Sequence, residues 1–219
     1  MSIFSRPYFL VALAFVAVTA GLLGGPRNSI DVGILRWLAL VRDSSPHLTS
    51  FVAILTQLGS AYATLGLGLT ASLWLLWRRQ RDKALLLAVA VAGERLVMDG
   101  LKLAIGRPRP PLEDIAALPQ SSSFPSGHSG NSMAVFVSIA LIAAPPTWRK
   151  AAAMFAMLMS VLVGLTRPYL GVHWPSDVVG GWALGLLAAG FAVTWGQRSG
   201  AIEAQHDIVG GHLPPVRED

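Results

Sequence analysis

Residues 51–77 read FVAILTQLGSAYATLGLGLTASLWLLW, a stretch of 27 residues in which no side chain is charged. A helix needs about 20 predominantly apolar residues to cross the hydrocarbon core of a bilayer. This stretch exceeds that length and carries no charge that would oppose insertion. It predicts a membrane-spanning segment, and a fold that is solvated by lipid as well as by water.

The composition of the whole chain agrees with this prediction. Hydrophobic residues make up 53% of the 219 residues and charged residues 13%, with a mean hydropathy of +0.55. Soluble globular domains carry about 25% charged residues. A chain with so few charges cannot cover a water-facing surface with polar groups. The expected fold is therefore an all-α, polytopic membrane protein, and the length fits a single domain.

Five more apolar runs accompany residues 51–77. The runs 128–144 and 151–165 are shorter than a span requires, so we expect each to extend into its flanking residues. Residues 1–197 form the predicted six-helix domain, and residues 198–219, rich in Gly, Pro and charge, form a predicted flexible cytoplasmic tail. The six predicted transmembrane helices are Tyr8–Leu23, Phe51–Trp77, Ala84–Ile105, His128–Ala144, Ala151–Leu165 and Val178–Trp195.

The first apolar run has a second interpretation, as a secretory signal peptide. Arg6 precedes an apolar core that ends in Val18-Thr19-Ala20, an arrangement that such peptides share. Gly and Pro follow without a clear cleavage motif. Either interpretation leaves the orientation of the other five segments unchanged.

The positive charges predict how the chain is oriented in the membrane. The chain has 17 basic and 12 acidic residues, a net charge of +5, and residues 78–83 alone hold four basic side chains. Lys and Arg are enriched in cytoplasmic connections, so we expect residues 78–83 and 145–150 on the cytoplasmic side with both termini.

A basic chain can also bind nucleic acid, but positively charged residues that lie between apolar runs argue against such a partner.

This orientation places residues 24–50, 106–127 and 166–177 together on the outer face. In the first of these connections Ile30, Ile34 and Trp37 recur at helical spacing, which predicts a helix lying in the membrane interface. Whether that helix gates the substrate or only connects two spans stays open. Gly181 and Gly185, four residues apart, predict close helix packing.

The third segment contains four ionisable residues: Glu94, Arg95, Asp99 and Lys102. A charge in a spanning helix costs about 2.5–3.5 kcal/mol on insertion scales, so it normally faces a protein interior or a wet cavity. The first three could form an internal salt-bridge ladder that only holds helices together. Lys102 lies near the outer end of the segment, beside the next cluster of polar residues.

Three cations and one helix start at the outer face have the properties of a phosphate site. Lys102, Arg109 and Arg167 supply positive charge, and arginine offers a planar fork that suits phosphate oxygens. Ser126 and Gly127 precede the fourth segment, where a helix N-terminus offers free N–H groups to an anion. Such groups also stabilise the charge of a phosphoryl-transfer transition state.

Two histidines and one carboxylate complete the expected site. A neutral imidazole can attack phosphorus, and a second, protonated imidazole can protonate the leaving alkoxide. His128 and His173 are the histidines near the cations, and Asp177, four residues after His173, can fix the tautomer of that ring. Singly, each residue has a simpler explanation, such as a first-turn acid for Asp177. Their convergence at one membrane depth favours a phosphoryl site.

These residues resemble the three-part signature of the type 2 phosphatidic acid phosphatase family, which shares its site with bacterial acid phosphatases and vanadium haloperoxidases. Lys102, Arg109 and Pro110 match its Lys-x6-Arg-Pro part, and residues 125–128 match Pro-Ser-Gly-His. The third part is Ser-Arg-x5-His-x3-Asp. Here Thr166 replaces the serine and keeps its hydroxyl, and the other matching positions are Arg167, His173 and Asp177.

The resemblance implies a metal-independent lipid phosphatase of the cell membrane without a cofactor, whose site faces outward. His173 would form a phosphohistidine, Asp177 would orient it, and His128 would protonate the leaving group. The phosphate would be bound by Lys102, Arg109, Ser126, Gly127 and Arg167.

The implied substrate is a membrane lipid phosphate: phosphatidic acid, phosphatidylglycerol phosphate, a polyprenyl diphosphate or a lipid A phosphate. The same residues could transfer the phosphate to another acceptor, as a lipid phosphotransferase does. A protein that only binds or transports phospholipids is a more remote alternative, because mere binding needs neither the paired histidines nor Asp177.

Overall fold

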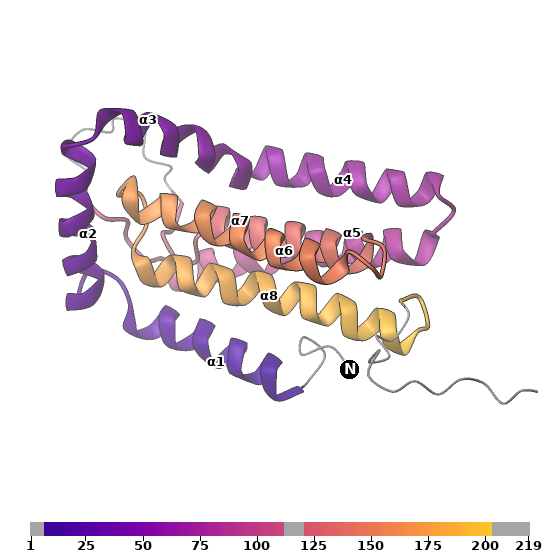
Figure 1. The fold of residues 1–219 in the computed structure, drawn as a ribbon. Coiled ribbons are helices and arrows are strands. Elements are labelled where there is room, and N and C mark those ends of the chain that lie inside the picture. Colours follow the sequence, from indigo (N-terminus) through magenta and orange to yellow (C-terminus); the bar gives the residue numbers. More distant parts are fainter. Residues whose placement is uncertain (1–6, 112–120, 203–219) are drawn as a thin grey trace, which may run out of the picture.

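The structure, a computed structural model, describes residues 7–111 and 121–202, and within these ranges all regular secondary structure is helical (Figure 1). This confirms the predicted all-α fold. Residues 203–219, most of the predicted tail, lie outside the described residues. The helices are α1 (Pro7–Leu23), α2 (Ser29–Asp43), α3 (Pro46–Leu55), the 3-10 helix η2 (Thr56–Gly59), α4 (Ala61–Trp77), α5 (Arg81–Ile105), α6 (Gly127–Ile142), α7 (Arg149–Tyr169) and α8 (Pro175–Arg198).

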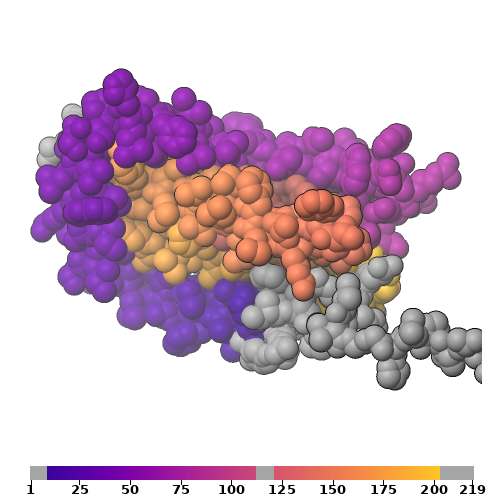
Figure 2. Space-filling view, viewed as in Figure 1, coloured from indigo at the N-terminus to yellow at the C-terminus, as the bar shows by residue number. Residues whose placement is uncertain are grey.

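Helices α1 and α4–α8 run side by side, and α2 lies across one end of the bundle (Figure 1). In the space-filling view α2 and α3 cover that end (Figure 2). Helix α6 lies at the centre and packs closely against α8. A Cβ added at Gly181 would lie 2.7 Å from the Ser126 carbonyl oxygen, and one at Gly185 2.6 Å from the Gly130 carbonyl oxygen. These glycines therefore serve close packing, as predicted, and bring the N-terminal ends of α6 and α8 together.

The predicted second span is not one continuous helix. Residues 51–77 are divided among α3, η2 and α4, because the Ser60 side chain accepts a hydrogen bond from the Ala63 amide and starts a new helix. The two arms meet at a bend of 44°. A Cβ at Gly59, beside this break, would clash with Val163 and lie 3.0 Å from the carbonyl oxygen of His128. The break thus lets η2 approach the first turn of α6.

Within the described ranges, α7 and α8 are each long and apolar enough to cross a membrane, and the bent pair Pro46–Gly59 and Ala61–Trp77 would make a third span. The apolar helices Phe9–Leu23 and Gly127–Ile142 are shorter than the 18 residues taken as the minimum for a span. All six predicted segments are helical, with the break described above in the second.

The charged residues of α5 do not form a ladder between helices. Arg95 and Asp99 pair within α5 at 2.9 Å, and both side chains are partly exposed. Glu94 is buried and faces α6, where a Cβ at Gly130 would lie 2.6 Å from its Oε1. With the Asn131 amide oriented to donate, its nitrogen lies 3.3 Å from Glu94 Oε2. Glu94 therefore contacts a neighbouring helix, whereas Arg95 and Asp99 pair with each other.

Helix α2 has the two faces that its sequence pattern predicts. Ile30 and Trp37 are 69% and 63% exposed, whereas Asp31 is buried. Asn28 caps the helix by accepting hydrogen bonds from the amides of Ile30 and Asp31. The apolar face therefore points away from the bundle, and the acidic residue points toward the start of α8.

Candidate active site

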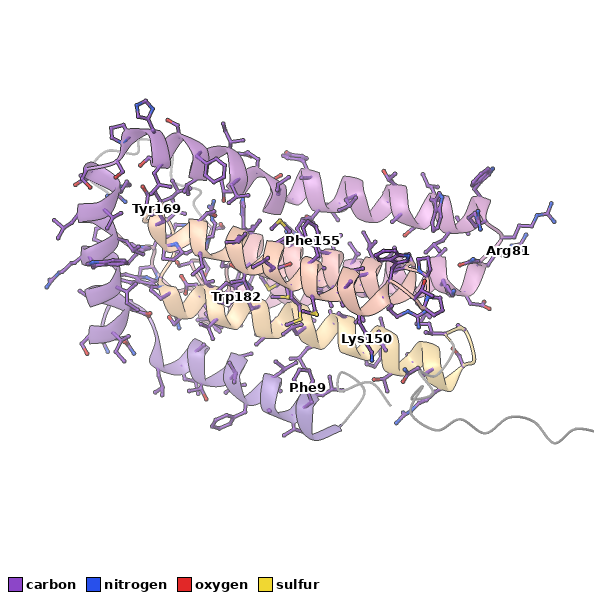
Figure 3. The ribbon with its side chains drawn as sticks, in the orientation of Figure 1. Phe9, Arg81, Lys150, Phe155, Tyr169 and Trp182 are labelled. Atoms are coloured by element: carbon purple, nitrogen blue, oxygen red, sulfur yellow. The ribbon has the colours of Figure 1, made fainter. Side chains whose placement is uncertain are left out.

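The predicted site residues lie at the end of the bundle that α2 covers. The C-terminal ends of α5 and α7 reach this end, and α6 and α8 begin there (Figure 1). In Figure 3, Tyr169 marks this end and Arg81 the opposite one. Four helix ends, from separate parts of the sequence, thus converge on one region.

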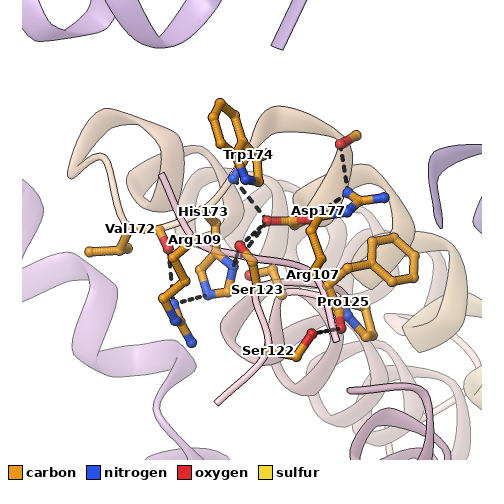
Figure 4. A network of polar contacts seen from close by, with 12 residues as sticks. Arg107, Arg109, Ser122, Ser123, Pro125, Val172, His173, Trp174 and Asp177 are labelled. Atoms are coloured by element: carbon orange, nitrogen blue, oxygen red, sulfur yellow. Dashed lines mark hydrogen bonds and ion pairs between the residues drawn. The ribbon is translucent and has the colours of Figure 1, made fainter. Parts of the chain in front are cut away.

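His173 and Asp177 form the centre of this region (Figure 4). Nδ1 of His173 lies 3.4 Å from Oδ2 of Asp177, and both side chains are buried. The same oxygen accepts a hydrogen bond of 2.9 Å from the Trp174 amide. Asp177 therefore has both functions considered from the sequence, because it satisfies an amide at the start of α8 and also faces the imidazole.

The other nitrogen of His173 faces Arg109. Nη1 of Arg109 lies 3.2 Å from Nε2 of His173 and donates a 2.9 Å hydrogen bond to the carbonyl oxygen of Val172. Burial lowers the pKa of His173 to about 4, although the hydrogen bond with Asp177 opposes this shift. The imidazole is thus neutral near pH 7. With a proton on Nδ1 facing Asp177, Nε2 keeps its lone pair on the side of Arg109.

Arg107 also contacts the carboxylate of the site, although it lies outside the sequence motif. Its Nη1 lies 2.7 Å from Oδ1 of Asp177, and its guanidinium lies over the ring of Phe124 at 4.6 Å. Arg107 is buried. The available signal was the repeated Arg-Pro at residues 107–110, of which only the second arginine fits the motif spacing. Ser123 also lies outside the motif; its buried hydroxyl donates to Oδ2 of Asp177.

Lys102 holds the chain that precedes α6. Its Nζ donates hydrogen bonds of 3.0 Å and 2.7 Å to the carbonyl oxygens of Ser122 and Pro125. A lysine has three N–H donors, so one of them remains for another acceptor. Lys102 therefore joins the end of α5 to the start of α6 and brings its amino group to the site.

The N-terminus of α6 differs in detail from the expectation. The Ser126 amide donates to the carbonyl oxygen of Asp177 at 3.0 Å, and its hydroxyl accepts from Ser129, so the amide does not face an anion. The amides of Gly127 and His128 belong to the first turn, which has no intrahelical acceptor. These two amides, with the Ser126 hydroxyl hydrogen, are the donors that α6 offers.

Arg167 and His128 lie on the side of the site that η2 approaches. Nη1 of Arg167 donates a 2.7 Å hydrogen bond to the Thr56 hydroxyl, and the Thr166 hydroxyl lies 2.8 Å from the same oxygen. Thr56 was not identified from the sequence, because the break in the second segment was not predicted. It fixes one terminal nitrogen of Arg167, whose buried Nε has no hydrogen-bond partner.

The His128 imidazole lies in the electrostatic field of four groups, which are Arg167, His173, Arg109 and Lys102. The structure thus brings both histidines and all three predicted cations into one region. Within residues 7–111 and 121–202, no three His, Asp or Glu side chains gather as metal ligands would. The arrangement suits an anionic phosphate among fixed cations, with a neutral imidazole nitrogen facing it.

Comparison with known proteins leads to the same chemistry. Residues 83–201 match the PAP2 superfamily model. Phosphatidylglycerophosphatase B of Bacillus subtilis is 35% identical over 182 residues, covering 80% of this chain and 87% of that protein. An undecaprenyl-diphosphatase of Sulfolobus acidocaldarius is 26% identical over 188 residues, covering 81% and 85%.

The fold is also similar to a solved structure. The crystal structure of a transmembrane PAP2-type phosphatidylglycerolphosphate phosphatase from Bacillus subtilis has a TM-score of 0.78 at 31% identity, and the match covers 87% of this chain and 97% of that one. The family model covers more than half of the chain, from α5 to the end of α8. The chain therefore belongs to the PAP2 superfamily, and it is a phosphate ester hydrolase of the membrane.

Proposed function

We propose that this protein removes phosphate from a membrane lipid through a phosphohistidine on His173. The observation that carries the proposal is the position of the buried imidazole between Asp177 and Arg109. Asp177 fixes the tautomer, and Arg109 marks where a phosphate oxygen would lie. A phosphorus atom bound beside Arg109 would then be within reach of the Nε2 lone pair.

In the first step Nε2 of His173 attacks phosphorus. The N–P bond forms while the bond from phosphorus to the lipid oxygen breaks, and that oxygen takes a proton from His128. Lys102, Arg109 and Arg167 neutralise the charge of the transferring group, with the amides of Gly127 and His128 and the Ser126 hydroxyl as hydrogen-bond donors. A phosphate dianion bound beside His128 would favour the protonated form of that imidazole, because opposite charges attract.

In the second step His128 acts as a base. It takes a proton from water, the water oxygen attacks phosphorus, and the N–P bond breaks with its electron pair returning to His173. Inorganic phosphate leaves. Asp177 stays ionised throughout, because Arg107 and three hydrogen-bond donors surround its carboxylate.

The proposed placement has six spans, both termini in the cytoplasm and the site at the outer face of the cell membrane. The basic residues between α4 and α5 lie at the end of the bundle opposite the site, as Arg81 shows in Figure 3. Cytoplasmic connections are enriched in Lys and Arg, so the opposite end, with His173, would face outward. A lipid headgroup can reach that end while its tails remain in the bilayer.

The proposed substrate is a lipid phosphate, with phosphatidylglycerol phosphate first among the candidates. The 35% identical relative is named for that substrate, and another relative is named for undecaprenyl diphosphate. The test is phosphate release by the purified full-length protein in lipid nanodiscs with a chelator. Phosphatidic acid, phosphatidylglycerol phosphate, a polyprenyl diphosphate and a lipid A phosphate form the panel.

We expect release from at least one member of the panel, and no release by His173→Ala. His47 lies on α3, is exposed, and is outside the site, so His47→Ala is the matched control and keeps wild-type activity. Turnover by His173→Ala at the rate of the control would contradict the proposal.

A further inference from the structure

The corner between α1 and α2 contains a buried acid, Asp31, that contacts the start of α8. Asp31 is 3% exposed. Its Oδ1 accepts a 2.9 Å hydrogen bond from the Ser176 amide, and its Oδ2 accepts from the Ser176 hydroxyl and, at 2.6 Å, from the Gly25 amide. The family match begins at residue 83, so this acid comes from outside the matched region. It binds the residue next to Asp177.

Ser176 connects Asp31 to Arg107. Because the Ser176 hydroxyl donates its only hydrogen to Asp31, its lone pairs are left as acceptors. Nη1 of Arg107 donates to that oxygen at 3.0 Å and to Oδ1 of Asp177 at 2.7 Å. Asp31 therefore determines that the hydroxyl accepts, rather than donates, where Arg107 approaches the carboxylate of Asp177.

The end of α1 binds the second terminal nitrogen, Nη2, of the Arg107 guanidinium. Nη2 of Arg107 donates to the carbonyl oxygens of Ala20 and Gly21 at 2.8 Å and 2.6 Å. A guanidinium has two hydrogens on each terminal nitrogen, so these four bonds use all of them. Arg107 thus has one fixed orientation. The end of α1 and Ser176 hold three of its four terminal N–H groups, and the fourth donates to Asp177.

The corner can approach this closely because it contains two glycines. A Cβ at Gly24 would overlap the hydroxyl of Ser176, and one at Gly25 would lie 3.1 Å from Cδ of Arg107. Gly25 also has a φ of +100°, in the region that disfavours other residues. The local sequence is therefore fitted to the side chains of Ser176 and Arg107.

We propose that Asp31 is a positioning residue for the catalytic histidine, acting through Ser176, Arg107 and Asp177. This inference rests on the proposed function, since it assumes that Asp177 orients His173 for attack. If Asp31 no longer orders Ser176, Arg107 loses one of its four acceptors and moves relative to Asp177. The carboxylate then orients the imidazole less well, and misplacement of a reacting group lowers the rate of the chemical step.

The charge of Arg107 also gives this link a signature in the pH profile. The titratable or charged groups that face His173 are Asp177 from α8, Arg109 after α5, Arg167 from α7 and His128 from α6. When Arg107 moves away, the carboxylate of Asp177 is less neutralised and stabilises the imidazolium more strongly. The acidic limb of kcat/KM, which reports the free enzyme, then moves to higher pH.

The test uses the full-length protein in nanodiscs, with short-chain phosphatidic acid, or the best substrate of the panel, as the probe. Asp31→Asn places an amide where a carboxylate accepted three hydrogen bonds. We expect kcat to fall about ten- to hundredfold with KM little changed, and the acidic limb to move to higher pH. A variant that merely loses folded protein would lose activity equally at every pH.

Ser176→Ala is the second variant, because it removes the hydroxyl and leaves the bonds of Asp31 to the amides of Ser176 and Gly25. Ser176→Ala should show the same fall in kcat and the same shift of the acidic limb of kcat/KM to higher pH. If Asp31→Asn does not fold, the result for Ser176→Ala alone tests the proposal. Asp43→Asn, on the same helix with a 72% exposed side chain, is the matched control and should behave as wild type.

His173→Ala separates this inference from the proposed function. If His173→Ala is active, the proposed function fails, and the inference fails with it. If His173→Ala is inactive while Ser176→Ala keeps the wild-type kcat and an unshifted limb, only the role of Asp31 is overturned.

Discussion

The guanidinium of Arg107 lies 2.7 Å from the carboxylate of Asp177, and the two side chains are 5% and 0% exposed. A buried ion pair adds little net stability relative to an apolar pair, but removal of one partner leaves an uncompensated charge and costs about 3–5 kcal/mol. Arg107→Ala should therefore lower the free energy of unfolding by about that amount and reduce kcat. Thermal unfolding in detergent and phosphate release measure the two effects.

Arg107→Lys should not restore either quantity. An ammonium cannot reach the Ala20 and Gly21 carbonyls and Asp177 together, as the planar fork of arginine does. Arg36→Ala removes an exposed arginine from α2 and serves as the control, with wild-type stability. An Arg107→Lys variant with wild-type stability and kcat would show that only the charge matters.

The pKa of His173 predicts how stability depends on pH. Burial lowers this pKa from 6.5 to about 4 in the folded protein. As pH falls from 6.5 to 4, the unfolded state takes up a proton that the folded state does not, so the free energy of unfolding decreases. Above pH 6.5 the residue contributes no pH dependence. As pH falls from 6.5 to 4, the unfolding temperature of the wild type should therefore decrease more steeply than that of His173→Gln. Parallel plots of unfolding temperature against pH would mean that His173 is not desolvated.

Thr56→Val removes the hydroxyl that accepts a 2.7 Å hydrogen bond from Arg167. A hydrogen bond to a charged group contributes about 1.5–3 kcal/mol. Because Arg167 would then bind phosphate without a fixed orientation, kcat/KM should fall by roughly tenfold or more. The hydroxyl of Thr70 bonds within α4 at an exposed position, so Thr70→Val is the control. Equal kcat/KM in the two variants would exclude a positioning role for Thr56.

Gly59→Ala and Gly66→Ala form a matched pair along the second segment. A Cβ at Gly59 would clash with Val163 and press on the first turn of α6, whereas a Cβ at Gly66 would meet nothing within 4 Å. We expect Gly59→Ala to cost about 1–3 kcal/mol of stability through overpacking and to lower kcat by displacing His128. Gly66→Ala should be neutral or gain up to about 1 kcal/mol from helix propensity. Similar unfolding curves for both variants would contradict the close approach of η2 to α6.

The positions of the helices could be predicted from the sequence because apolar runs and charged connections determine them locally. Each of the six predicted segments is helical, and the exposed apolar face of α2 follows its spacing. The break after η2 could not be predicted, because Thr56, Gly59 and Ser60 are all compatible with an apolar span. The Ser60 cap that starts α4 is accompanied by a tertiary contact, the approach of Gly59 to His128, which the local sequence does not indicate.

The gathering of the motif residues at one end of the bundle could be predicted, because each motif stands at the end of a predicted helix. The residues that support them could not. Arg107 and Arg109 have the same Arg-Pro context, and the motif spacing selects only Arg109. The position of Arg107 depends on tertiary contacts with the end of α1 and with Asp177. The engaged amide of Ser126 depends on the packing of α6 against Asp177. The burial of Asp31 could not be predicted either, because its partner Ser176 lies 145 residues away.

The most direct test of the mechanism is to trap the phosphorylated protein. Rapid mixing with a radiolabelled lipid phosphate, followed by an alkaline quench that preserves phosphohistidine, should give labelled protein whose phosphate maps by mass spectrometry to the peptide that contains His173. Label on another residue, or turnover by His173→Ala with no labelled protein, would contradict attack by His173.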